Sequence, residues 1–340
     1  MQEKALSQEQ LLSAITSLSN PKEQLEELIA VVREMFATIA RLTEPEPNIL
    51  ILDQVESFIT WVKRRFKLKK PGKAIGDTGL GKTCACLACL DEFGVVRQAN
   101  QIPEIPVLYI QIDTNACNTA KFFDSILTAL KQKAKGGTKS QLQQRAWKFL
   151  KQCKVRMIII DEAHCLHYSV LKDVRHLYDD REFRIIPILI GTSSRLDALV
   201  EKDEQVRDRF ANTFIFEELL GDKFKKTLEM WKTSIIKMQD PLNPNDPKRI
   251  IPLLRINDAV VSTLEKMAGG ELRLLDNILR DAAVRLLEDK LREIDQAVLQ
   301  ALKTDEKVLD FNVKKILRET KIDKQLLESM QGEYWRGQSA

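Results

Sequence analysis

Short apolar runs alternate with amphipathic stretches through the middle of the chain. The runs are rich in β-branched residues, and they are Val107–Ile112, Met157–Ile160, Ile185–Ile190 and Phe214–Phe216. Such runs are typical of strands buried on both faces of a parallel sheet. The amphipathic stretches predict helices at Lys82–Phe93, Ala120–Lys133, Gln141–Cys153 and Ser169–Asp179. The alternation indicates right-handed β–α–β units and an α/β core over about 50–218.

The segments on either side of this core have the spacing of helices. Residues 1–43 carry apolar positions at helical intervals until Pro45 and Pro47, and a further helix is expected at about Ile51–Phe66. Beyond Glu218 the strand pattern stops. The helices expected there are Asp222–Met238, Asn257–Met267, Gly270–Lys290, Glu293–Leu302 and Val308–Arg318. The predicted parts are an N-terminal helical segment (1–48), an α/β domain (49–218), a second, helical domain (219–290) and a C-terminal helical extension with a tail (291–340).

A glycine-rich motif of the form GxxxxGK[ST] opens the helix expected at Lys82–Phe93. It consists of Gly76, Asp77, Thr78, Gly79, Leu80, Gly81, Lys82 and Thr83. Glycines allow backbone N–H groups to surround a phosphate chain, and the N-terminus of the following helix faces the same phosphates. Lys82 is expected to reach the β- and γ-phosphates and Thr83 to ligate Mg²⁺. The strand before the loop is unusual, because only Ala74 and Ile75 in it are apolar.

A second motif is the acidic pair Asp161–Glu162, which directly follows the apolar run Met157–Ile160. The carboxyl end of a parallel strand lies at the sheet edge where ligands bind in α/β folds. We expect Asp161 to hold Mg²⁺ there and Glu162 to polarise the attacking water. Two acids after a strand are more often a helix cap. Their position about 75 residues after the P-loop, with one strand between, favours the catalytic interpretation and predicts ATP hydrolysis.

From about residue 50 to 290 the sequence resembles the AAA+ ATPases. The resemblance implies a P-loop core with a central parallel sheet, followed by a helical lid at 219–290. The expected strand before Gly191-Thr192-Ser193 is similar to the one that ends in the family's first sensor. The resemblance therefore implies that Thr192 faces the γ-phosphate.

The same resemblance implies roles for arginines in two segments. The segment 205–210 looks like the one that supplies an arginine finger to a neighbouring subunit, with Arg209 the first choice and Arg207 the second. A guanidinium spreads charge over transition-state oxygens, although a surface ion pair is the alternative for both residues. Arg273, within Gly270–Arg273, is similar to the second sensor, which reaches the nucleotide from the lid. A finger supplied by a neighbour requires a homo-oligomer, either a ring or a helical filament.

Among AAA+ proteins, the chain looks most like bacterial transposition regulators of the TnsC and TniB kind. The features that carry this resemblance are the compact ATPase module, the Gly-Thr-Ser sensor, the Arg-Phe finger segment and the stretch Ile112–Phe123. The resemblance implies a protein that binds double-stranded DNA as an ATP-dependent oligomer. It would link a target-selection protein to transposase recruitment, with hydrolysis as a regulatory switch.

Four side chains are candidates for DNA contact. Thr119 lies where a helix is expected to start, so its hydroxyl and nearby N–H groups can meet a phosphate, although an N-cap is the alternative. Lys121 follows on the same helix. Lys151 and Lys154 have weaker claims, because a run of like charges such as theirs is usually a solvated face. No helix-turn-helix or zinc finger is evident for base recognition. DNA binding is therefore expected to be largely independent of sequence and to weaken steeply with salt.

The net charge of +4, from 53 basic and 49 acidic residues, conceals an uneven distribution. Lys63–Lys73 contains seven basic residues and Lys131–Arg156 nine, and neither window contains an acid. The windows together carry sixteen positive charges, so the rest of the chain is negative by about twelve. This placement indicates a polyanionic partner more clearly than the net charge does.

The composition indicates a cytoplasmic protein without a membrane span. No apolar run is long enough to cross a bilayer, and the polar N-terminus is unlike a signal peptide. Six cysteines are too few for a disulfide scaffold of this size. A zinc site is a minor alternative, since it needs four convergent ligands. Its candidate ligands are Cys86, Cys89, His164, Cys165, His167 and His176.

Other functions remain open within the same superfamily. The main alternative is a helicase loader or replication initiator, although no aromatic platform for single strands is evident. A motor that remodels proteins would need an aromatic pore loop, which is absent between Ile112 and Lys121, and a signalling NTPase would need repeats or an effector domain. The tail segment Gly332–Gly337 is either a frayed end or an aromatic anchor for a partner.

Overall fold

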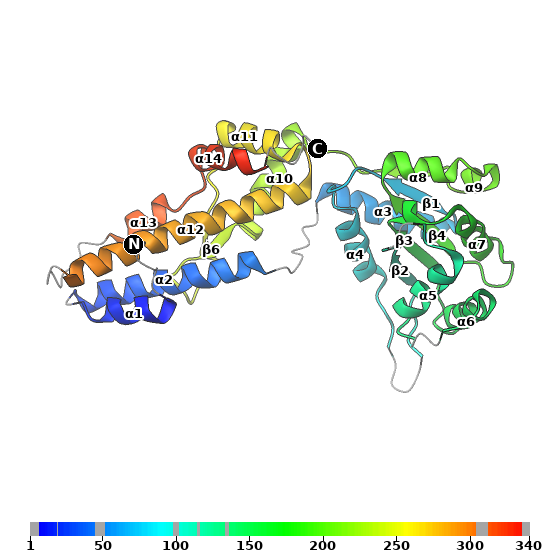
Figure 1. The fold of residues 1–340 in the computed structure, drawn as a ribbon, viewed down its shortest axis with the longest axis horizontal. Coiled ribbons are helices and arrows are strands. Elements are labelled where there is room, and N and C mark those ends of the chain that lie inside the picture. The colour runs from blue at the N-terminus through cyan, green and yellow to red at the C-terminus, as the bar shows by residue number, and fades with distance from the viewer. Residues whose placement is uncertain are drawn as a thin grey trace. The chain divides into compact units, whose positions relative to one another are not determined.

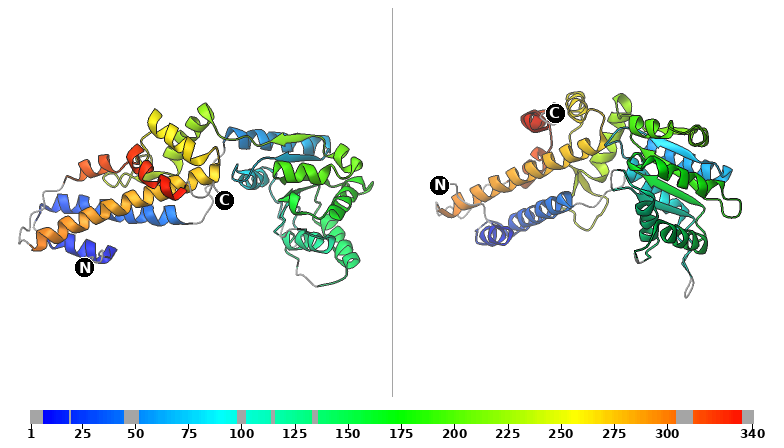
Figure 2. Two further views of the ribbon diagram at one scale, coloured as in Figure 1. Left: turned by 45° about the horizontal axis from the view of Figure 1, so that its top comes forward. Right: turned by 45° about the vertical axis from the view of Figure 1, so that its right-hand side comes forward.

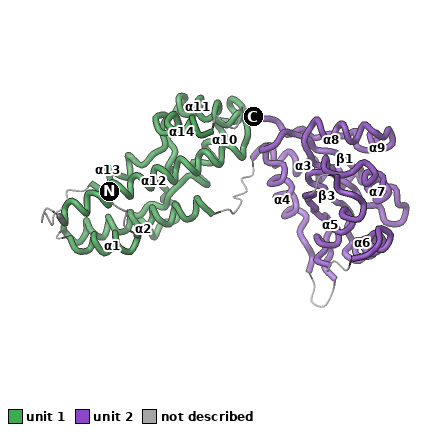
Figure 3. Tube along the Cα trace, in the orientation of Figure 1, with its two compact units in different colours: residues 1–48, 219–340 green, residues 49–218 purple. Residues whose placement is uncertain are grey.

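The computed structural model of the chain describes residues 7–18, 20–44, 52–97, 102–113, 116–132, 136–303 and 312–334. The chain divides into two compact units (Figure 3). One comprises residues 49–218, here called the α/β unit. The other comprises residues 1–48 together with 219–340, here called the helical unit. In the described ranges, no helix is long and apolar enough to cross a membrane.

The α/β unit contains a five-stranded parallel sheet with the order β2-β3-β4-β1-β5. The strands are β1 (Gly72–Ile75), β2 (Val107–Gln111), β3 (Met157–Asp161), β4 (Ile186–Gly191) and β5 (Thr213–Ile215). Every residue of β3 and β4 is buried, which explains why both strands read as continuous apolar runs. The fold therefore has the central parallel sheet that the sequence predicts.

Helices cover both faces of the sheet (Figure 1). They are α3 (Asp53–Leu68), α4 (Lys82–Phe93), α5 (Thr119–Ala129), α6 (Lys139–Gln152), α7 (Tyr168–Asp179), α8 (Ser193–Val200) and α9 (Glu204–Arg209). A short 3₁₀ turn, η1 (Ala163–Cys165), follows β3. Helices α3 and α4 pack on each other, and α5 packs on α6 and α7. A buried cluster joins α5, α6 and α7 to one face of the sheet.

The polar strand β1 is accommodated by particular contacts rather than by apolar side chains. It lies between β4 and β5. A Cβ on Gly72 would lie 2.7 Å from Cζ2 of Trp61, so only glycine lets the indole pack there. The side chain of Lys73 is largely buried and forms an ion pair with Asp197. These contacts explain how so short and polar a strand can occupy an interior position.

The helical unit contains seven helices and one small sheet within the described residues. The elements are α1 (Gln8–Thr16), α2 (Lys22–Thr43), α10 (Gly221–Ser234), β6 (Lys237–Gln239), β7 (Ile250–Pro252), α11 (Asp258–Ala268), α12 (Leu272–Lys303), α13 (Val313–Glu319) and α14 (Lys324–Tyr334). Helices α2 and α12 lie side by side (Figures 1 and 2). Arg280 donates to the carbonyl of Leu42 at 3.3 Å, which links the beginning and the later part of the sequence.

Several expectations for the helical unit are wrong in detail. The helix expected to end at Met238 ends at Ser234, because Lys237–Gln239 pairs with Ile250–Pro252 in an antiparallel sheet. The two helices expected at 270–302 form one helix, α12, in which Lys290 and Glu293 pair at 2.9 Å across the expected break.

At the N-terminal end the expected helical structure is confirmed for the described residues, as α1 and α2, with Pro21 at the N-cap of α2. The C-terminal end is better ordered than a frayed tail. Gly332 and Tyr334 are not a frayed end, because they belong to α14, and the Tyr334 hydroxyl donates to Asp281 at 2.8 Å. The remaining tail residues, 335–340, lie outside the described ranges.

Candidate nucleotide site

The P-loop connects β1 to α4 at the carboxyl edge of the sheet. Gly79 and Gly81 have φ values of 84° and 82°, a backbone conformation that strongly favours glycine. A Cβ on Gly76 would lie 2.6 Å from Cβ of Phe216. Lys82 is buried and donates from Nζ to the carbonyl oxygens of Gly76 at 2.9 Å and Asp77 at 2.6 Å. The lysine ammonium therefore lies inside a loop whose left-handed backbone at two positions strongly favours glycine.

The acidic pair begins with Asp161, which is fully buried beside the P-loop helix. The hydroxyl of Thr83 donates to Oδ2 of Asp161 at 2.7 Å, and the Tyr109 hydroxyl donates to the same oxygen at 3.0 Å. The backbone N–H of Glu162 donates to Oδ1 at 2.8 Å. Hydroxyl and carboxylate oxygens are the ligands that Mg²⁺ prefers. The Thr83–Asp161 contact therefore fits a magnesium site.

Tyr109 is a contributor that the motifs do not identify. Burial, and then the Asp161 carboxylate, raises the pKa of Tyr109 far above its usual range. The phenol therefore remains protonated and serves as a donor to Asp161. No sequence motif marks this residue, because Tyr109 lies within an apolar run and only the pairing of β2 with β3, in register with Ile159, brings it to this edge.

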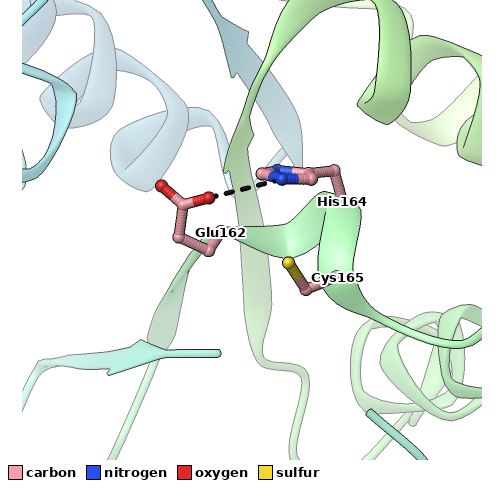
Figure 4. A group of neighbouring side chains, drawn as sticks. All are labelled: Glu162, His164 and Cys165. Carbon is pink, nitrogen blue, oxygen red and sulfur yellow. Dashed lines mark ion pairs between the residues drawn. The ribbon is translucent and has the colours of Figure 1, made fainter. Parts of the chain in front are cut away.

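Glu162 lies in the left-handed region of the backbone map, with φ 53° and ψ 34°. A non-glycine residue in this conformation carries a strain of roughly 1–3 kcal/mol, which is common at functional sites. Its Oε2 lies 3.4 Å from Nε2 of His164 (Figure 4). Burial lowers the pKa of His164, so the imidazole is neutral near pH 7. The backbone N–H of Thr192 reaches Nδ1 of the same ring at 3.5 Å.

This ring thus connects the ends of two neighbouring strands. If Nδ1 accepts from Thr192, the proton of the neutral imidazole is on Nε2, the atom that faces Glu162. A Cβ on Gly191 would lie 3.1 Å from Nδ1, so the absence of a side chain there leaves room for the ring. His164 therefore lies among the residues of the candidate nucleotide site.

The hydroxyl of Thr192 is buried and has no hydrogen-bond partner in the part of the chain that the structure describes. Thr192 directly follows Gly191, whose carbonyl accepts from the N–H of Gly76 at 3.3 Å. A buried polar group without a partner is rare and costs free energy. Its position next to the first glycine of the P-loop makes it available to a ligand at this edge.

Among the described residues, the candidate zinc ligands come together only in part. His164 and Cys165 have ligand atoms within 4.8 Å of each other and of Glu162 (Figure 4), which is one ligand fewer than the four of a structural zinc site. His167 caps α7, where its Nδ1 accepts from the Ser169 N–H at 3.3 Å. His176 lies in the last turn of α7, and Cys86 and Cys89 are buried on α4. Burial raises the pKa of Cys86 and raises that of Cys89 to about 12, so both are protonated thiols.

The two candidate finger arginines lie on α9 in different surroundings. Arg209 forms a two-pronged pair with Asp179, from Nε to Oδ1 at 3.0 Å and from Nη2 to Oδ2 at 2.9 Å. Arg207 is more exposed and lies 3.5 Å or more from the carboxylates of Glu204 and Glu201. Sequence reasoning did not identify Asp179 as the partner of Arg209.

Arg273 lies at the start of α12 in the helical unit, where its side chain is exposed. The turn before it contains Gly270 with φ 81°, and the carbonyl of Gly270 accepts from Leu219 at 3.1 Å. Its contact with a nucleotide stays a prediction.

The candidates for DNA contact do not share one surface. Thr119 is buried, with only 4% of its surface exposed, and its hydroxyl donates to Asp173 at 2.6 Å. The N-cap of α5 is Asn118 rather than Thr119, and Asn118 accepts from the Lys121 N–H at 3.1 Å. The interpretation of Thr119 as a cap is therefore wrong, and its hydroxyl already has a partner within the protein.

The two lysines are exposed but lie at opposite edges of the sheet. Lys121 is in the first turn of α5, after the carboxyl end of β2. Lys151 is in the last turn of α6, before the amino end of β3, and it pairs with Glu182 at 3.9 Å. No continuous contact surface that includes both lysines follows from this arrangement.

The α/β unit has recognisable relatives in fold. The chain is similar to the ORC1 protein of Aeropyrum pernix, solved in complex with DNA, with a TM-score of 0.53, 16% identity, and coverage of 87% of this chain and 69% of that one. It is also similar to the ADP form of the ORC2 protein of Aeropyrum pernix, with a TM-score of 0.50, 13% identity, and coverage of 86% and 72%. At these identities the likeness establishes the fold, which is that of AAA+ ATPases.

The sequence itself gives the family. No curated protein is similar enough to this chain to count as a match. Residues 49–218, half of the chain, match the family described as bacterial TniB protein. This segment coincides with the α/β unit that holds the P-loop, the acidic pair and the unpartnered Thr192 hydroxyl. The chain thus belongs to the bacterial TniB family.

Proposed function

We propose that this protein is an ATP-dependent, DNA-binding AAA+ regulator of transposition. It assembles on double-stranded DNA and links target-site selection to transposase recruitment. The observation that carries the ATPase part lies at the carboxyl edge of the sheet: Thr83 contacts Asp161, and the buried Thr192 hydroxyl has no hydrogen-bond partner among the described residues. Membership of the TniB family supports the part of the proposal that concerns transposition, which the resemblance to TnsC and TniB regulators implies.

The residues of the site divide the work on ATP. Lys82 exchanges the carbonyls of Gly76 and Asp77 for phosphate oxygens, and the remaining loop positions Thr78, Gly79, Leu80 and Gly81 enclose the phosphate chain. Thr83 and Asp161 hold Mg²⁺, which when bound neutralises phosphate charge. The carboxylate of Glu162 orients the attacking water and takes its proton. The hydroxyl of Thr192 donates a hydrogen bond to the γ-phosphate.

Two arginines complete the site in the assembled protein. Arg209 reaches the ATP of a neighbouring copy, for which it leaves Asp179, and Arg207, two residues earlier on α9, is the second choice. Arg273 reaches the nucleotide from the lid. A residue supplied by a neighbour makes hydrolysis depend on a ring or filament of identical subunits.

Contact with DNA is assigned to Lys121 and to the N-terminal turn of α5. The side chain of Lys121 is exposed and lies after the carboxyl end of β2, at the edge of the sheet where we propose that ATP binds. Nucleotide binding and DNA contact can therefore be coupled over a short distance. Lys151 lies at the opposite edge of the sheet and is a weaker candidate for DNA contact. Because phosphates dominate such contacts, binding should depend little on sequence and strongly on salt.

The experiment that tests this proposal is negative-stain imaging with duplex DNA and ATP or ADP. We expect rings or filaments on duplex with ATP, assemblies that persist longer in Glu162→Gln, and none in Lys82→Ala. The first change retains nucleotide binding and stops hydrolysis, whereas the second removes the phosphate contact. Assembly that is indifferent to both changes would contradict the mechanism, and a preference for single strands would favour a helicase loader.

A further inference from the structure

A large hollow lies at the amino edge of the sheet, away from the P-loop. Its volume is about 800 Å³, within the usual range for ligand sites. It is bordered by the residues that lead into three strands, since Arg156 donates from its N–H to Pro106 at 3.0 Å and accepts from Ile186 at 2.9 Å. The proposed ATP site lies at the opposite, carboxyl ends of these strands, so the residues of this hollow take no part in the proposed ATP hydrolysis.

The hollow is strongly basic. Five cationic side chains line it against two carboxylates, Glu104 and Glu182, and we call it the basic hollow. The cations are Lys69, Lys154, Arg156, Arg181 and Arg184. Three of them come from the two acid-free windows of the sequence. The fold thus brings the ends of both windows to one place.

The carboxylates in the basic hollow already have partners, whereas most of the cations do not. Glu104 forms an ion pair with Lys154, and Glu182 lies 3.9 Å from Lys151. No carboxylate of the described residues lies within ion-pair distance of the other four cations: Lys69, Arg156, Arg181 and Arg184. The site therefore has an excess of positive charge that a ligand can satisfy.

Aromatic rings hold two of the guanidinium groups in place. Arg156 lies over the ring of Phe66 at 4.4 Å, and Arg184 lies over the ring of Tyr178 at 5.1 Å. A guanidinium stacked on a ring keeps its N–H groups available at its edge and loses less entropy when it binds. Phe66 and Phe183 also line the hollow and offer apolar surface.

We infer that the basic hollow binds an acidic peptide segment of a partner protein, with aspartate or glutamate side chains next to an apolar or aromatic one. Arginine forks pair bidentately with carboxylates, and the two phenylalanines accept the apolar side chain. A duplex presents its phosphates along a convex rod, which does not enter a hollow of this size. Shape therefore favours a peptide over DNA.

The test is fluorescence anisotropy with the full-length protein, in the absence of nucleotide and DNA. The probe is a short labelled peptide in which aspartates alternate with phenylalanines, and the comparison probe carries asparagine in place of aspartate. We expect the acidic probe to bind, the asparagine probe to bind at least about tenfold more weakly, and binding to weaken with salt.

The variant that reverses the excess charge is Arg181→Glu with Arg184→Glu. We expect it to weaken the acidic probe by about tenfold or more, because two attractive contacts become repulsive. The matched control is Lys67→Glu with Lys148→Glu. It makes the same charge change at one exposed position in each basic window, outside the hollow. The control should retain peptide binding.

Two further measurements keep the outcome decisive. Melting curves must show that both double variants fold, and Arg181→Gln with Arg184→Gln replaces the reversal if it does not. Equal loss in reversal and control, or no binding of the acidic probe to the unaltered protein, would overturn the inference. Labelled single-stranded or duplex DNA that binds in place of the peptide and is lost with the reversal would overturn it in favour of nucleic acid. Because nucleotide is absent, none of these outcomes depends on the proposed ATPase.

Discussion

The two edges of the five-stranded sheet differ in whether their charged side chains have partners within the protein. At the carboxyl edge Lys82 binds the carbonyls of its own loop, and Asp161 accepts three hydrogen bonds. At the amino edge the basic hollow retains cations that no carboxylate in the described residues satisfies. At the carboxyl edge a ligand would have to replace these internal partners, whereas the amino edge has an excess of positive charge that a ligand could neutralise. A site of the first kind is expected to be specific in geometry, and one of the second to be sensitive to salt.

The strongest test of the carboxyl edge is Asp161→Asn. Asparagine keeps the size of the side chain, but its amide is a weak ligand for Mg²⁺ and a donor facing the hydroxyls of Thr83 and Tyr109. We expect ATP turnover to fall by about 100-fold or more, measured as phosphate release at saturating ATP. Asp91→Asn, an exposed position on α4, is the control. If Asp161→Asn retains turnover, the edge does not hold the metal.

A smaller change separates ligand binding from stability at the same edge. Thr192→Val removes a buried hydroxyl that has no partner in the described protein. We expect ATP turnover to fall about tenfold while the melting temperature stays the same or rises, because no internal hydrogen bond is lost. Thr192→Ser should restore turnover. Parallel losses of turnover and melting temperature would show that the hydroxyl serves the fold rather than the nucleotide.

The smallest effect is expected at His164, which faces Glu162. His164→Asn removes the donor near Glu162, whereas the longer side chain of His164→Gln can replace Nε2. We expect the asparagine variant to lower kcat by about threefold with KM unchanged, and the glutamine variant to recover part of it. Equal kcat in both variants and the unaltered protein would remove His164 from the site.

The same residue predicts an effect of pH on stability. Burial lowers the folded-state pKa of His164, so the unfolded chain binds a proton first as the pH falls. Stability is therefore retained above the ordinary histidine pKa of about 6.5 and declines below it. His164→Gln should show a smaller drop in melting temperature between about pH 8 and pH 5.5. An equal drop would mean that other groups determine the acid sensitivity.

Much of the α/β unit follows from the sequence because its signals are local. The P-loop and the acidic pair have fixed patterns, and their strands are continuous apolar runs. The contacts that join distant residues have no such pattern. Tyr109 lies within an apolar run, and only the pairing of β2 with β3 brings its hydroxyl to Asp161. The pair between Arg209 and Asp179 depends in the same way on how α9 packs on α7.

The helical unit was harder to predict for a related reason. Strands of three residues, such as β6, are too short for a periodic pattern, and they pair across a proline-containing loop. The sequence divides this region between Lys290 and Glu293, whereas in the structure these two side chains pair at 2.9 Å within the single helix α12. Likewise, nothing in the sequence of α2 indicates that it packs against α12, because each is an ordinary amphipathic helix whose apolar face could pack on many partners.

The packing of α2 on α12 has a consequence for how the protein is made. The apolar face of α2, with Leu28, Val31 and Met35, leaves the ribosome before α12, which is translated more than two hundred residues later. The α/β unit lies between them and is complete once residue 218 has emerged, so it can fold first. Until α12 is made, α2 has α1 beside it but lacks its long partner helix, so part of its apolar face stays exposed. Synthesis therefore completes the α/β unit before the helical unit, although residues 1–48 of the helical unit are translated before either is complete.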